Sequence, residues 1–164
     1  MSRRTLTQGI GASALAFTGY TAVMLVLERR MRATGGPGII PFELAGNASR
    51  AEAIMARWGD GGQRAARIST WLDFGYMATY GNLLALLVER TRRRCGHPAG
   101  LPALVGVAVA ADAVEGVSLL NVLRGHRVAD NARRARTAAL IKFAVLVLSL
   151  AYVAVGSMRP RATP

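Results

Sequence analysis

The sequence predicts an all-α integral membrane protein, a four-helix bundle with a short amphipathic interfacial helix in its first loop. Of the 164 residues, 52% are hydrophobic and only 18% are charged, whereas a soluble domain carries about 25% charged residues. The charges are clustered, which leaves four long stretches nearly free of them. The stretch 101–123 is long enough to cross a bilayer, which takes about 20 apolar residues. We therefore expect a single transmembrane domain over residues 1–164.

The net charge of +12 comes from arginines that flank the apolar stretches. Cations in such positions meet anionic lipid head groups, so we expect membrane lipids as partners and no nucleic acid. Cys95 is the single cysteine, which excludes an intrachain disulfide and a thiolate metal cage. Because His97 and His126 fall in predicted loops, we expect no haem or zinc site inside the bundle. The Arg-, Ala- and Gly-rich composition favours a bacterial inner membrane.

The first helix is predicted over residues 6–27, as an uncleaved span that ends at a basic flank. Gly and Pro then open a long connection. Within it, residues 49–58 are predicted to form the amphipathic helix, with a capping box formed by Ser49 and Glu52. GDGG is expected to end this helix just after Trp58. The helix lies either at the membrane interface or over the bundle as a lid.

Three further spans are predicted over residues 68–88, 101–123 and 137–155. In the first of these, Asp73, Tyr76 and Tyr80 follow an i, i+3, i+7 spacing, which places them on one face. In the next, Asp112 and Glu115 are three residues apart and also share a face. Carboxylates at such depth are costly, and they usually face a protein interior.

In a chain with four spans, the first and third loops lie on the same side of the membrane. Measured from that side, Asp73, Glu115 and Lys142 lie at depths of roughly 8 to 12 Å. Asp112 lies one turn deeper, and Glu43 approaches from the first loop. These side chains therefore predict a shared internal site. Lys142 is close enough to the expected helix end that it either belongs to this site or snorkels to the surface.

Charge counting limits what such a site contains. Asp73, Asp112, Glu115 and Lys142 together carry a formal excess of two negative charges. We therefore expect one or two carboxyls to be protonated, or a cation to complete the site: a metal ion, a loop arginine or a cationic amphiphile. The alternative is a structural network in which Lys142 pairs with a carboxylate and the tyrosines bind the other acids.

Several segments resemble a family of small, uncharacterised bacterial four-helix membrane proteins. These are ELAG, WG, LDFGYMATYG, DAVEGVSLL and the lysine of the last helix, which together extend from Glu43 to Phe143. The family pattern is D-x-x-E-N, whereas Gly116 follows Glu115 here. The resemblance implies the architecture and brings no assigned activity. A looser similarity in the type of site is to sterol-isomerase and sigma-2-receptor-like membrane proteins, which place acidic residues in a lipid-accessible cavity; the isomerases also use a histidine.

Three functions fit these features. The first is a pocket that binds or transports a lipid-like or cationic ligand, with proton coupling as an option, and transport would require a homo-oligomer. The second is an enzyme acting on an isoprenoid or another lipid, with Asp112 or Glu115 as the general acid and Tyr76 or Tyr80 positioning the substrate. The third is a structural or accessory subunit. The residues predicted to bind the ligand or proton are Glu43, Asp73, Tyr76, Tyr80, Asp112, Glu115 and Lys142.

Overall fold

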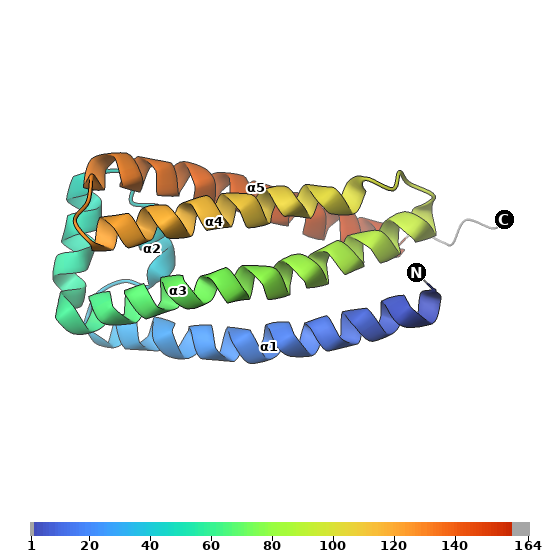
Figure 1. Cartoon of the computed structure of the whole chain (residues 1–164), viewed down its shortest axis with the longest axis horizontal. Coiled ribbons are helices and arrows are strands. Elements are labelled where there is room, and N and C mark those ends of the chain that lie inside the picture. Colours follow the sequence, from blue (N-terminus) through green and yellow to red (C-terminus); the bar gives the residue numbers. More distant parts are fainter. Residues whose placement is uncertain (1, 159–164) are drawn as a thin grey trace.

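The computed structural model describes residues 2–158, so Met1 and residues 159–164 of the predicted domain lie outside it. All regular structure in the described part is helical, which confirms the predicted all-α class (Figure 1). The elements are α1 (Arg3–Ala33), α2 (Ile39–Glu43), α3 (Ala48–Cys95), the 3-10 helix η1 (Leu101–Ala103), α4 (Leu104–Leu123) and α5 (Val128–Met158).

Three helical segments within residues 2–158 are long and apolar enough to cross a membrane: Arg4–Ala33, Leu101–Leu123 and Val128–Met158. They correspond to three of the four predicted spans and indicate a membrane protein. The other predicted span, 68–88, lies inside α3 and is not among them. Polar side chains such as Asp73, Thr79 and Asn82 interrupt its apolar sequence.

The helices at both ends of the chain are longer than predicted. Ser2 caps α1, which continues to Ala33 rather than ending at residue 27. α5 begins at Val128, so residues 128–136, which were expected to form a loop, are helical. Asp130 lies in the first turn of α5, where a carboxylate is favoured by the helix dipole.

The predicted amphipathic helix is the first part of α3, and it ends at GDGG as predicted. Asn47 caps it by accepting a hydrogen bond from the Arg50 amide at 2.9 Å. The predicted capping box is wrong, because the Ser49 hydroxyl donates to Asn47 instead. At Gly59 the backbone adopts the non-helical angles φ 54° and ψ −167°, so α3 consists of two helices that meet at this kink. Glycine permits this conformation because it has no Cβ.

The first part of α3 lies across one end of the other long helices (Figure 1). Trp58 is 1% exposed there and belongs to a core cluster with Met31 and Phe42. A tryptophan this deeply buried packs inward against the protein. This helix therefore covers the end of the bundle, and its position at the membrane interface stays a prediction.

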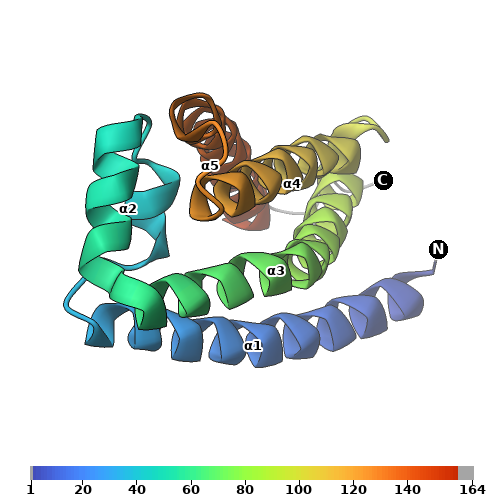
Figure 2. The ribbon, with the colours of Figure 1, turned by 60° about the vertical axis from the view of Figure 1, so that its left-hand side comes forward.

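The long helices pack unevenly. α4 packs on α5 and both contact α3, whereas α1 packs against α3 on its outer side, away from α4 and α5 (Figures 1 and 2). Small and polar residues bring α1 close to α3. The Asn82 amide donates to the Ser13 hydroxyl at 2.7 Å, and Gly75 leaves room for the ring of Tyr20. This arrangement leaves α1 and α5 as opposite walls of a cavity.

Candidate functional site

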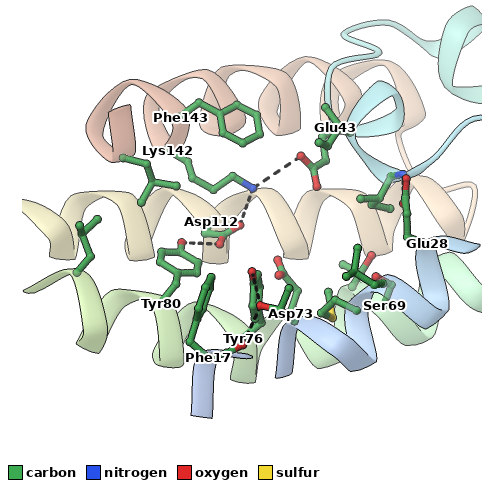
Figure 3. Close-up of a pocket in the computed structure, with 18 of the residues that line it drawn as sticks. Phe17, Glu28, Glu43, Ser69, Asp73, Tyr76, Tyr80, Asp112, Lys142 and Phe143 are labelled. Atoms are coloured by element: carbon green, nitrogen blue, oxygen red, sulfur yellow. Dashed lines mark hydrogen bonds and ion pairs between the residues drawn. The ribbon is translucent and has the colours of Figure 1, made fainter. Parts of the chain in front are cut away.

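A cavity of about 780 Å³ lies between the long helices, and α2 contributes to its wall (Figure 3). One part of it is lined by ionisable and polar side chains from five helices. These are Glu28 and Arg32 of α1, Glu43 of α2, Ser69, Thr70, Asp73, Tyr76 and Tyr80 of α3, Asp112 of α4 and Lys142 of α5. The structure thus brings to one part of the cavity six of the seven side chains that the sequence predicts for a shared site.

Lys142 lies at the centre of the acidic cluster, which we define as Glu43, Asp73, Asp112 and Glu115. Its Nζ atom is 2.9 Å from Asp112 Oδ1, 2.8 Å from Glu115 Oε2 and 3.8 Å from Glu43 Oε2. Only 8% of its side chain is exposed. Lys142 is therefore an internal ion-pair partner, and the alternative of a snorkelling lysine is wrong.

Asp112 connects Lys142 to α3. Its second carboxylate oxygen accepts a hydrogen bond of 2.6 Å from the Tyr80 hydroxyl (Figure 3). Asp73 lies about two helical turns before Tyr80 on α3, and its carboxyl interacts with that of Asp112. Tyr76 does not bind an acid in the described structure; its hydroxyl accepts from Thr21, and its ring stacks on Phe17 at a centroid distance of 5.5 Å.

Glu115 differs from the other predicted residues because it does not line the cavity. It is 1% exposed and contacts Lys142 from within the helix packing. Asp112 and Glu115 share a face of α4 as predicted, yet only Asp112 is accessible from the cavity. Of the two candidate catalytic acids, Asp112 is thus the one that a bound molecule can contact.

Glu43 enters the site from α2, outside the segments predicted to span the membrane. It is 8% exposed and lies against the Glu115 carboxyl. Its Oε2 atom is buried and has no hydrogen-bond donor among the described residues. Burial raises the pKa of Glu43 above its ordinary value of 4.5, an effect that the Lys142 ammonium only partly offsets.

We expect Glu43→Gln to stabilise the fold at neutral pH. Because the pKa of Glu43 is higher in the folded than in the unfolded chain, its favourable contribution is complete below about pH 4.5 and is lost as the pH rises through the folded-state pKa. A tenfold difference in proton affinity between the two states corresponds to about 1.4 kcal/mol of stability. Thermal unfolding from pH 4.5 to 8 checks this: the advantage of Glu43→Gln should grow with pH, and a constant difference would contradict it.

The sequence did not predict the contribution of α1 to the site. Glu28 lines the cavity, and its carboxylate accepts from Arg32 Nε at 2.7 Å and from the Ile39 amide at 2.9 Å. It thereby holds the start of α2 against the end of α1. Glu28 is the first acid after a long apolar run, but it stands beside two arginines, a pattern typical of a basic membrane flank.

Beyond the acidic cluster, the cavity continues as an apolar arm. It is lined by leucines of α3 and α5: Leu83, Leu84, Leu87, Leu146 and Leu150. From Lys142 to Leu150 the arm follows α5 for about 12 Å. The cavity is therefore amphiphilic, with charged groups at one end and hydrocarbon along the other.

Comparisons with protein-family models, with curated proteins and with solved structures find no match to this chain. The resemblance to a family of small bacterial membrane proteins stays a prediction.

The charge excess in the site is larger than the sequence alone indicated. With Glu43 included, four carboxyls face a single ammonium, Lys142, which leaves a formal excess of three negative charges. The carboxyls also interact with one another in two pairs, Glu43 with Glu115 and Asp73 with Asp112. Such an excess of negative charge favours a further cationic group at the site.

Proposed function

We propose that this protein binds a lipid-like amphiphile from the surrounding membrane. The single observation that carries this proposal is that one continuous cavity joins the acidic cluster to the apolar arm. The polar head of the ligand would lie at the acidic cluster and Lys142, and its hydrocarbon chain would follow the leucines of α3 and α5. In this arrangement the second part of α3 crosses the membrane beside α1, α4 and α5, which makes four spans. The composition supports a bacterial inner membrane.

The position of exposed apolar residues supports entry of the ligand from the lipid. Leu25, Ile40 and Leu150 line the cavity, yet they are 52%, 53% and 55% exposed. They come from α1, α2 and α5, the elements around the cavity mouth. In a bilayer these side chains face hydrocarbon, so a lipid can pass between α1 and α5 without leaving the membrane.

The apolar end of the bundle favours binding over transport. Leu84, Val88 and Val105 form a buried cluster there, with Leu101 and Leu146 packed against it. Passage of a charged group through this cluster would require desolvation with no polar partner. The cavity is also formed within one chain, so binding does not depend on the homo-oligomer that transport would need.

Filling the cavity with a large side chain tests this function. We expect Met24→Trp to remove the lipid that copurifies with the wild-type protein, because Met24 lines the cavity and the larger side chain would fill it. The matched control is Val23→Trp, since the neighbouring Val23 is 48% exposed and does not line the cavity. Native mass spectrometry of protein purified in a mild detergent measures the bound lipid. Equal lipid occupancy in the two variants would contradict the proposal.

A second candidate function is acid–base catalysis on the bound lipid, and the hydrogen bond from Tyr80 to Asp112 favours it. This pair lies on the cavity wall and links a phenol, a carboxyl and the Lys142 ammonium in one chain of contacts. Such a chain can deliver a proton to a bound double bond or hydroxyl. Conversion of the copurified lipid to a product of different mass or retention time separates catalysis from binding.

A further inference from the structure

We infer that the head group of the bound amphiphile is a protonated primary or secondary amine whose N–H groups bind Glu43. This inference rests on the proposed function and specifies the ligand of the same site. It begins from Glu43 Oε2, a carboxylate oxygen of a cavity-lining residue that is buried and has no donor among the described residues. About nine-tenths of the Glu43 side chain is buried, so water reaches it poorly. A buried acceptor without a donor is costly, and a ligand that supplies the donor removes that cost.

The neighbouring cations do not donate a hydrogen bond to Glu43 Oε2. Lys142 directs its ammonium to Asp112 and Glu115 at 2.9 and 2.8 Å, and its distance of 3.8 Å from Glu43 is too long for a hydrogen bond. Arg32 also lines the cavity, but its Nε atom donates to Glu28. Among the acids that line the cavity, Glu43 is therefore the one with a buried oxygen that lacks a donor in residues 2–158.

The carboxyl excess favours a cation over a neutral donor. Four carboxyls surround one ammonium, so each added positive charge relieves repulsion among the acids. A hydroxyl head group would satisfy Glu43 Oε2 without changing this balance. An ammonium with N–H groups donates a charge-assisted hydrogen bond to Glu43 Oε2, and its positive charge also reduces the repulsion among the acids.

The surroundings of the site favour an ammonium that carries N–H over a metal ion or a quaternary ammonium. Lys142 Nζ already occupies the space between Asp112 and Glu115, and in residues 2–158 no group of three suitable side chains is placed to hold a metal. A quaternary ammonium has no N–H to donate, and its binding depends on open aromatic faces. The Tyr76 ring is stacked on Phe17 and meets the edge of Tyr80, so these rings do not form an open cage.

Probes with the same tail and different heads test the inference. Dodecylamine, dodecyltrimethylammonium and dodecanol are added at pH 7.5 to protein purified in maltoside detergent, and native mass spectrometry gives the apparent affinity of each. We expect the wild type to bind dodecylamine about tenfold more tightly than the other two, the size of one hydrogen bond to a charged group. Glu43→Gln should lose this preference and keep its affinity for dodecanol. Glu52→Gln, which removes an exposed acid at the same end of the molecule, should behave as the wild type.

The outcomes separate the two proposals. Equal affinity for dodecylamine and dodecanol in the wild type, with both lost in Met24→Trp, would overturn the amine and leave the lipid-binding function intact. Tight binding of dodecyltrimethylammonium would overturn the requirement for N–H donors. An unchanged amine preference in Glu43→Gln would overturn the role of Glu43. Absence of binding for all three probes would overturn the proposed function itself.

Discussion

Lys142→Met is expected to lower the free energy of unfolding by about 3–5 kcal/mol, the loss that follows when one partner of a buried ion pair is removed. Lys142 is the one ammonium among the four carboxyls of the acidic cluster. Methionine keeps the length of the apolar stem and removes the charge, so the variant isolates the electrostatic contribution. Unfolding by SDS in mixed micelles, followed by circular dichroism, measures the change.

Two controls make this result specific. Arg133→Met removes an exposed arginine from the same helix, where it pairs with Asp130 at 3.0 Å, and it should leave the unfolding free energy unchanged. Asp112→Asn combined with Lys142→Met should regain part of the lost stability, because the two residues are in direct contact. The deficit should also shrink as the pH is lowered and the carboxyls take up protons. A Lys142→Met protein as stable as the wild type at pH 8 would contradict the central role of this ion-pair cluster.

The level of the polar residues along the helices could be predicted from the sequence because it follows from connectivity and helix rise. Asp73, Asp112 and Lys142 were expected in adjacent layers, and the structure brings them to one part of the cavity. Whether they bind a ligand there is still a prediction. The predicted depth of Lys142 within its helix was wrong. Lys142 lies fourteen residues after the first residue of α5 rather than about five, because that helix begins at Val128.

The details that were missed depend on tertiary contacts. The sequence does not show how each helix is rotated, so it could not distinguish Asp112, which lines the cavity, from Glu115, which lies behind it. Glycines at GDGG indicate a break in a helix, and the structure has this break at Gly59, but the sequence did not show that the next helix begins directly after the kink rather than at residue 68. Glu28 acts through the backbone amide of Ile39, a contact between residues that only the folded loop brings together.

The segment that carries Glu43 into the cavity is held by a single large side chain, Trp58. Its indole nitrogen donates to the Pro37 carbonyl at 2.6 Å, and its ring packs on Phe42 at a centroid distance of 4.9 Å. The ring also lies directly against Gly36, where even a Cβ would meet it at 2.3 Å. Trp58 therefore fixes residues on both sides of α2 and the position of Glu43 itself.

Trp58→Ala is accordingly expected to cost about 3–5 kcal/mol in stability, as for other fully buried aromatic side chains. Its effect should concentrate on residues 34–47, whose amides should exchange hydrogen faster than those of α4 and α5. The preference for dodecylamine over dodecanol, which depends on Glu43, should disappear when the amides of residues 34–47 lose their protection from hydrogen exchange. Trp58→Phe keeps most of the packing and removes the hydrogen bond to Pro37, so a loss of about 1 kcal/mol is expected. Trp71→Ala, at a tryptophan that is 53% exposed, should leave both measurements unchanged. Faster exchange spread evenly over all helices in Trp58→Ala would mean that Trp58 stabilises the whole bundle and does not specifically hold α2 over the cavity.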